Sequence, residues 1–176
     1  MKFALMMTVV NSAFWFFLHF GLAGLVTALP QDVKARLFDP ARPCFQVSDG
    51  EMRFYRKIHL PRWKDSLPQF NPEFDKRHLR VQLTEGYLNE FLLITCKAEF
   101  IHVAIAVLGF LSLLFSLACD DPAWNLLHIF LPIAVVLALC NLPFAMIQRY
   151  NRYRLVRLKG QFARRTSAGL SERSVL

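Results

Sequence analysis

Three long apolar segments constrain the fold of this chain more than any other feature of its sequence. They cover residues 3–29, 100–119 and 123–147, and none of them contains Lys or Arg. Each exceeds the roughly 18 residues that a helix needs to cross the hydrocarbon core of a bilayer. The sequence therefore predicts an all-α integral membrane protein with three transmembrane helices, at about residues 4–29, 100–119 and 123–147.

The first segment is predicted to stay in the membrane rather than to be removed as a signal peptide. Residues 26–28 resemble a small-residue cleavage site, but the apolar core is about twice the usual 7–15 residues and only Lys2 precedes it. Asn11, Trp15 and His19 are four residues apart and fall on one helical face. That face either packs against another helix or lines a substrate groove.

The distribution of charge predicts which parts of the chain face the cytosol. The net charge is +8; residues 30–99 hold twelve of the 21 Lys and Arg, the tail from Gln148 holds eight, and the turn at 120–122 holds none. By the positive-inside rule, the middle segment and the tail are cytosolic, whereas the N-terminus and the turn face outward. Cations that flank membrane spans favour anionic lipid or an anionic cytosolic substrate over nucleic acid. We expect one multi-pass domain of the cell membrane, residues 1–176, with a cytosolic helical and loop insertion at 30–99 and a basic, disordered tail at 160–176.

The insertion is predicted to contain short helices and turns rather than one long helix. Aromatic and cationic residues alternate over residues 53–70, and Pro61 and Pro68 interrupt this stretch. Such a mixture is typical of the headgroup layer, where rings bury their bodies and charges stay hydrated. The stretch is therefore either an interfacial anchor or a cationic lip that binds phosphate or carboxylate.

The best candidate for chemistry lies where the insertion meets the second span. Thr84 is a good N-cap, and the pattern after it predicts one helix over about residues 85–118. Glu99 and His102 fall on one face of that helix, at i and i+3. A carboxylate can orient an imidazole so that the ring takes a proton from a hydroxyl. A pair of interfacial anchors would also explain the two residues.

The third span ends in a stretch with many hydrogen-bond donors. Pro143 predicts a kink near its cytosolic end. Asn141, Gln148 and Arg152 share a face through this kink, and residues 148–155 interleave Gln and Asn with Arg and Tyr. A basic end to a span is ordinary, but this composition indicates recognition by hydrogen bonds as well as topology.

Three blocks of the chain resemble a known family in their order and spacing, over roughly residues 54–158. The blocks are Arg62-Trp63-Lys64 with Arg77-His78-Leu79; Ala98-Glu99-x-x-His102; and Asn141-x-Pro143 followed by Gln148-Arg149-Tyr150-Asn151-Arg152-x-Arg154-Leu155. They resemble the glycosyl-4,4'-diaponeurosporenoate acyltransferases, small membrane enzymes of staphyloxanthin-type carotenoid biosynthesis. The family pattern has an acid before Thr95 and a basic residue after it, where this chain has Ile94 and Cys96. The acceptor is therefore a carotenoid glycoside, another glycolipid or a lipid-linked alcohol.

The resemblance implies transfer of a fatty acyl group to a sugar hydroxyl of a lipid-like glycoside. It makes His102 the general base and Glu99 the group that orients it. The donor would be acyl-CoA or an acyl-carrier protein, bound as a substrate, and we expect no cofactor and no metal. The residues expected to bind substrate are Arg62, Trp63, Lys64, Arg77, His78, Asn141, Gln148, Arg149, Asn151 and Arg152.

Other interpretations are open at this point. The chain could be a non-catalytic membrane subunit that docks on or stabilises a larger membrane complex. A metal-dependent lipid enzyme would need a second Glu-x-x-His motif and further carboxylates, and the chain has one such motif. The sequence contains no Gly-x-Ser-x-Gly, so a serine acyl-enzyme is unsupported. Cys96 could act as a nucleophile, but direct transfer is simpler.

Overall fold

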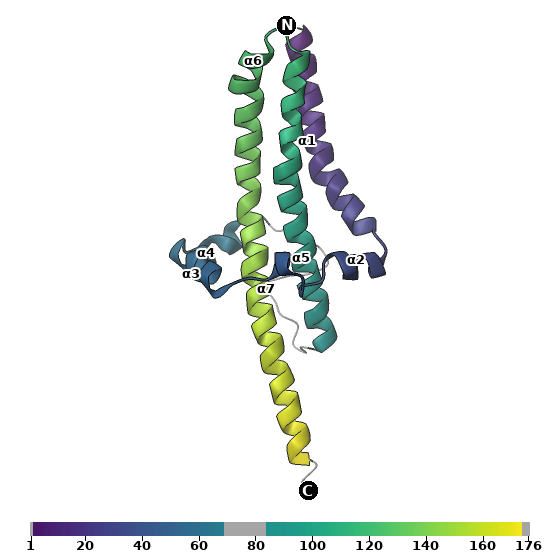
Figure 1. The fold of residues 1–176 in the computed structure, drawn as a ribbon, viewed down its shortest axis with the longest axis vertical. Helices are drawn as coiled ribbons and strands as arrows, with labels where there is room; N and C mark the ends of the chain where they lie inside the picture. Colours follow the sequence, from purple (N-terminus) through teal and green to yellow (C-terminus); the bar gives the residue numbers. More distant parts are fainter. Residues whose placement is uncertain (1, 69–83, 174–176) are drawn as a thin grey trace. The chain divides into compact units, whose positions relative to one another are not determined.

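The computed structural model describes residues 2–68 and 84–173, whose regular structure is helical throughout (Figure 1). Three of its helices are long and apolar enough to cross a membrane: Phe3–Ala28, Glu85–Ala118 and Pro122–Arg164. The prediction of an all-α protein with three such helices is confirmed. The chain divides into two compact units, residues 1–34 with 97–145 (unit 1) and residues 35–96 with 146–176 (unit 2).

Unit 1 consists of apolar helices and the tight turn that joins two of them. The one helix predicted over about residues 85–118 is found as Glu85–Ala118; it begins as an α-helix and continues from Gly109 as a 3-10 helix. A short π-helical turn precedes the third long helix. The elements are α1 (Lys2–Ala28), the end of α5 (Glu85–Leu108), η3 (Gly109–Ala118), α6 (Pro122–Asn125), η4 (Leu126–Phe130) and the start of α7 (Leu131–Arg173).

The core of unit 1 is built around Trp15. This side chain packs with Ile105 and Ala134, and all three are buried. Its indole lies directly on Gly109: a Cβ at that glycine would be 2.1 Å from an atom of the six-membered ring. Only a residue without a side chain fits there, and the α-helix gives way to the 3-10 helix at the same position.

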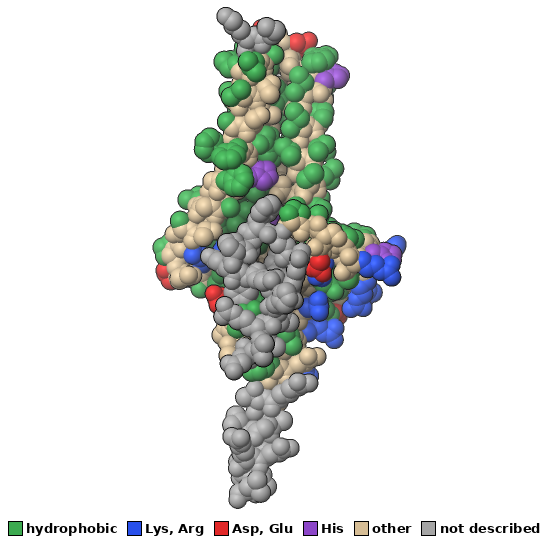
Figure 2. Space-filling model, turned by 180° about the vertical axis from the view of Figure 1, so that it is seen from behind, with side chains coloured by type: hydrophobic (Ala, Val, Ile, Leu, Met, Phe, Trp, Pro, Cys, Tyr) green, Lys and Arg blue, Asp and Glu red, His purple; other side chains and the backbone are tan. Residues whose placement is uncertain are grey.

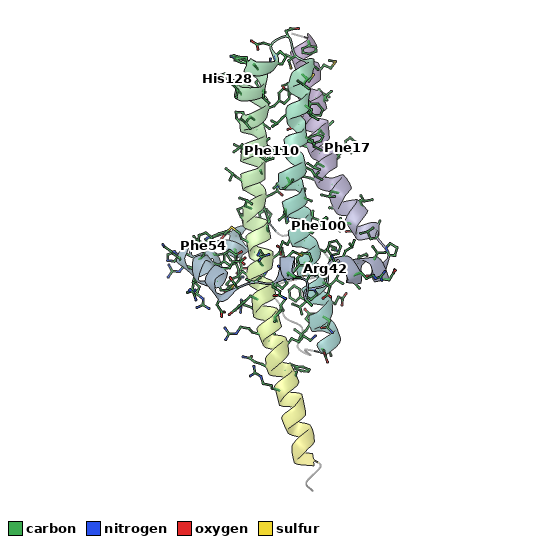
Figure 3. The ribbon with its side chains drawn as sticks, viewed as in Figure 1. Phe17, Arg42, Phe54, Phe100, Phe110 and His128 are labelled. Carbon is green, nitrogen blue, oxygen red and sulfur yellow. The ribbon has the colours of Figure 1, made fainter. Side chains whose placement is uncertain are left out.

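The outer surface of unit 1 is apolar. Phe17, Phe100 and Phe110 are all exposed; Figure 3 labels them, and Figure 2 shows hydrophobic side chains over much of the visible face of these helices. Large exposed apolar surfaces of this kind are disfavoured in water but normal against lipid tails. The exposed apolar side chains and the lengths of the three helices therefore both indicate that these helices cross a membrane.

Unit 2 contains the predicted short helices. They are the end of α2 (Gln31–Leu37), η1 (Pro43–Phe45), α3 (Asp49–Lys57), α4 (Leu60–Trp63) and η2 (Lys64–Ser66), packed with the start of α5 and the later part of α7. The chain turns between α3 and α4 at His59, whose φ of 55° lies in the left-handed region. Pro61 then occupies the first turn of α4, where proline is tolerated.

Two apolar clusters hold unit 2 together. In one, Met52, Tyr55 and Leu60 pack against Ile147 and Tyr150 of α7. In the other, side chains of α5 pack against Leu155 of α7, and the partly buried Leu158 and Phe162 of α7 pack beside it; its buried members are Leu88, Phe91, Leu92, Ile94 and Leu155. The residues that α7 contributes are spaced so that they fall on two neighbouring stripes of the helix.

Two local expectations about the long helices can be compared with the structure. Thr84 caps α5, because its hydroxyl accepts a hydrogen bond from the backbone N–H of Tyr87 at 3.2 Å. The helix α7 runs through Pro143 and continues past Gly160 to Arg173, where the sequence predicts disorder. Ala and Arg make up five of residues 161–173 and have high helix propensity, which favours continuation of the helix; the disorder predicted for the tail stays a prediction.

Candidate active site

His102 lies on the part of α5 that belongs to unit 1, and two residues of α7 hold its ring. Nδ1 lies 3.1 Å from Oδ1 of Asn141. The ring also stacks on Phe144, with centroids 4.9 Å apart and planes inclined by 17°. Asn141 and Phe144 are three residues apart, so both side chains leave α7 on one face. The result is an imidazole fixed in position and in plane.

The other contacts of Asn141 determine how its amide is oriented. Nδ2 lies 2.9 Å from the carbonyl oxygen of Leu137 and 3.5 Å from Nε2 of His19. An amide nitrogen only donates and an amide oxygen only accepts, so Oδ1 accepts from His102. Nδ1 of His102 therefore carries a proton, and in the neutral ring Nε2 has the lone pair.

His19 extends this arrangement to α1. Its Nδ1 lies 2.9 Å from the backbone carbonyl of Trp15, which only accepts, so Nδ1 of His19 is also the protonated nitrogen. Nε2 of His19 then accepts from Asn141. Hydrogen bonds are thus donated in one direction, from His102 to Asn141, from Asn141 to His19 and from His19 to Trp15. We call this arrangement of His102, Asn141 and His19 the His–Asn–His network.

Glu99 is placed one helical turn before His102 and is buried, with 6% of its surface exposed. A carboxylate at that level of an apolar helix must be partnered and is a candidate for function. The role predicted for Glu99, orientation of the His102 ring, stays a prediction. An orienting partner that the sequence did not reveal is Asn141, at Nδ1.

In unit 2, Arg149 fixes the segment before α3 to α7. Its guanidinium donates to both carboxylate oxygens of Glu51, with Nη2 to Oε2 at 2.9 Å. It also donates to the carbonyls of Cys44 and Gln46, at 2.9 and 2.8 Å. Glu51 is held in the first turn of α3, because its backbone N–H donates to the hydroxyl of Ser48, the N-cap of the helix. The predicted role of Arg149 in binding substrate stays a prediction; in the structure its guanidinium binds Glu51 and two carbonyls of its own chain.

Arg152 has a similar structural task. It is almost fully buried, donates from Nε to the carbonyl of Phe45 at 2.7 Å, and lies over the ring of Phe45 at 5.3 Å. Gln148, on the same turn, is also buried. As ligands of a substrate, both residues stay predictions; in this structure both are interior residues of unit 2.

The polar contacts around α3 shift two tyrosines and one carboxylate from their ordinary pKa values. Burial acts to raise the pKa of Glu51, but hydrogen bonds from Arg149 and Tyr55 outweigh it, and the pKa is lowered. Burial and the hydrogen bond to Glu51 raise the pKa of Tyr55 well above its usual range. A hydrogen bond to Asp49 raises the pKa of Tyr153. Both phenols therefore stay protonated donors at physiological pH.

A groove of about 810 Å³ opens on unit 2 and is lined by many cations. Its cationic members come from three elements, namely Arg56 of α3, Lys64 of η2 and Arg154 and Arg157 of α7. Figure 2 shows Lys and Arg side chains of this unit gathered at its surface. The other lining residues are Met52, Asp65, Phe91, Ile147, Tyr150, Asn151, Tyr153, Leu155, Leu158 and Gln161.

The relation to known proteins rests on one finding. A family model for glycosyl-4,4'-diaponeurosporenoate acyltransferases matches residues 34–161, which is more than half of the chain. The chain belongs to this family. No curated protein and no solved structure matches it. Membership confirms the resemblance seen in the sequence, and the name of the family indicates an acyltransferase of carotenoid biosynthesis.

The part shared with the glycosyl-4,4'-diaponeurosporenoate acyltransferases contains most of the features described above. Glu99, His102 and Asn141 lie within residues 34–161, as does the whole of the groove. His19 lies before the matched part, so the His–Asn–His network joins a shared segment to one that the family match does not cover.

The remaining residues predicted to bind substrate divide into three groups. Lys64 and Asn151 line the groove. Arg62 is exposed on α4, whereas the indole of Trp63 donates to the carbonyl of Ile58 at 3.0 Å and packs on the core. Arg77 and His78 lie outside the described residues. Among the described residues, no cluster of His, Cys, Asp and Glu has an arrangement that would hold a metal ion.

Sequence reasoning missed several members of the groove. Arg56, Arg157 and Gln161 were not among the predicted site residues. A signal was present, because residues 150, 154, 157 and 161 recur at helical spacing and mark one stripe of α7. Cys96 is fully buried, a setting typical of structural rather than reactive thiols.

Proposed function

We propose that this protein transfers a fatty acyl group from a thioester donor to a sugar hydroxyl of a glycosylated, lipid-like acceptor in the membrane. The family indicates acyl transfer. The observation that carries the proposal is the His–Asn–His network, which gives His102 a fixed ring and an Nε2 lone pair. A positioned imidazole of this kind is what removal of a proton from a hydroxyl requires.

The chemical step follows from that geometry. Nε2 of His102 takes the proton of the acceptor hydroxyl while the hydroxyl oxygen attacks the thioester carbonyl. The tetrahedral intermediate collapses with cleavage of the carbon–sulfur bond, and the leaving thiolate takes the proton back from the imidazolium. An ester and a thiol result, and the protein is unchanged. Glu99 is assigned the orientation of the His102 ring.

Substrate binding is assigned to the remaining polar residues. Arg62 and Lys64 are candidates to bind donor phosphate or the developing oxyanion, since charge-assisted hydrogen bonds are the strong ones. Asn151, and Arg77 with His78, are candidates for the sugar. The acceptor is a carotenoid glycoside or a related glycolipid, and the active face is cytosolic in the cell membrane, as the charge distribution predicts.

The proposal is tested with purified protein in nanodiscs, a fatty acyl thioester and a glycosylated lipid. His102→Ala should lower transfer by roughly 100- to 10,000-fold. His128→Ala is the control, because it removes an imidazole from the same kind of apolar helix: Nδ1 of His128 lies 2.9 Å from the backbone carbonyl of Trp124, outside the network. If His102→Ala keeps more than about a tenth of the activity, the general base is elsewhere and a non-catalytic subunit becomes the better interpretation.

The contribution of Asn141 can be separated from folding. Asn141→Leu should lower kcat while the KM values stay close to those of the wild type if Asn141 acts by orienting the His102 ring, whereas a raised acceptor KM would support the predicted role of Asn141 in binding substrate. Asn89→Leu, on the exposed face of α5, is the control. The His102 and Asn141 substitutions should be non-additive when combined, since both act on one proton transfer.

A further inference from the structure

The groove of unit 2 combines positive charge with an apolar and amide-containing wall. Four cations line it, and one carboxylate, Asp65, is paired with Lys64 at 2.6 Å, so that these five groups sum to +3. Phe91, Leu155 and Leu158 add an apolar side. A lipid headgroup needs only the charge, whereas a ligand with both phosphates and a flat ring uses all of the lining.

We propose that this groove binds the phosphorylated adenosine part of a coenzyme A thioester, so that acyl-CoA is the donor of the transfer. The inference rests on the proposed function only in assuming that the bound coenzyme A carries an acyl group. Coenzyme A carries a 3'-phosphate and a diphosphate, which complement the cations. Gln161 offers an amide that can both donate to and accept from ribose or adenine.

Two of the arginines are pre-organised for phosphate. Arg154 lies over the ring of Tyr150 at 5.7 Å and Arg157 over the ring of Tyr153 at 5.6 Å. Tyr153 is itself held, because its hydroxyl donates to Asp49. A guanidinium stacked on a fixed ring loses less conformational entropy when it binds phosphate, and its fork matches two phosphate oxygens.

The concave shape favours a nucleotide over a carrier protein. Sites for small ligands are clefts of about 300–1,000 Å³, and the groove has about 810 Å³. A carrier protein presents a folded, convex surface and needs a broad interface of roughly 1,000 Å² or more. Such a surface could touch the rim of the groove but could not use residues on its walls.

The test measures binding of adenosine 3',5'-bisphosphate to the full chain in nanodiscs of uncharged phosphatidylcholine. Arg56→Gln and Arg157→Gln should each weaken binding about tenfold or more, since hydrogen bonds to charged groups are the strong ones. Higher salt should weaken it further, because the exposed cations are screened. The matched controls, Arg53→Gln on α3 and Arg164→Gln on α7, remove the same charge outside the groove and should stay within about twofold of the wild type.

Three results would overturn the inference. The first is no binding of the bisphosphate by the wild type, and the second is equal weakening in the groove variants and the controls. The third is transfer from an acyl-carrier protein with none from acyl-CoA. Failure of the proposed function is separate: His102→Ala should bind the bisphosphate normally, and a chain that binds it but transfers no acyl group from any donor would refute the function and keep the site.

Discussion

The ion pair between Glu51 and Arg149 should be a main support of unit 2, and Glu51→Gln tests it. The side chains of the pair are 23% and 21% exposed, so the pair is neither fully solvated nor fully buried. Glu51 accepts from Arg149 with both oxygens and from the hydroxyl of Tyr55. Hydrogen bonds to a charged group contribute about 1.5–3 kcal/mol, whereas exposed ion pairs contribute about 0–1 kcal/mol. We expect Glu51→Gln to cost about 2 kcal/mol, toward the lower part of the first range because of partial solvation.

The assay is thermal unfolding in detergent, followed by intrinsic fluorescence. For a chain of this size, about 2 kcal/mol corresponds to a fall in Tm of roughly 4–8 °C. Asp65→Asn is the control, because its partner Lys64 forms an ion pair in which the aspartate side chain is 53% exposed. Equal shifts for the two variants would refute the argument that burial and the number of hydrogen bonds make the Glu51 pair special.

The same pair predicts a dependence on pH. The pKa of Glu51 is lowered on folding, so its contribution to stability is present above the ordinary value of 4.5 and is lost as the pH falls through the lowered value. The wild type should therefore lose stability below that value more steeply than Glu51→Gln. Parallel curves for the two proteins in acid would show that other carboxylates dominate.

Three further predictions concern packing, backbone and topology. Gly109→Ala should destabilise unit 1 by about 1–3 kcal/mol, because its methyl group would overlap the indole of Trp15; Trp15→Leu in the same background should recover part of the loss in Tm. His59→Gly should change the free energy of unfolding little or raise it, whereas His59→Val should lower it by about 1–3 kcal/mol, because a β-branched residue is strained at a φ of 55°. A cysteine at Asp121, in a background without other cysteines, should react with an impermeant reagent from outside the cell; labelling only from the cytosol would reverse the topology.

Features that depend on neighbours along the chain could be predicted from the sequence. The apolar lengths predicted three helices, Thr84 predicted the start of α5, and the prolines of the insertion predicted short helices. Glu99 and His102 could be placed together because i and i+3 share a face of any helix.

Features that depend on contacts between distant segments could not be predicted from the sequence. The bond from His102 to Asn141 spans 39 positions, and that from Arg149 to Glu51 spans 98. An arginine in a basic motif can bind phosphate or the chain itself, and only the fold brings Glu51 within reach. The contact between Gly109, where η3 begins, and the indole of Trp15, 94 positions earlier, is of the same kind.

The His–Asn–His network could in principle adopt two hydrogen-bond patterns, which differ in the orientation of the Asn141 amide. A flip of the Asn141 amide would invert all three groups together and turn Nε2 of His102 into a donor. Two backbone carbonyls, on Leu137 and Trp15, independently exclude that inverted pattern. Because both groups belong to the backbone, no side-chain substitution removes them directly. Replacement of His19 by Leu should therefore leave Nε2 of His102 as the acceptor, and only local unwinding of the helices could invert the pattern.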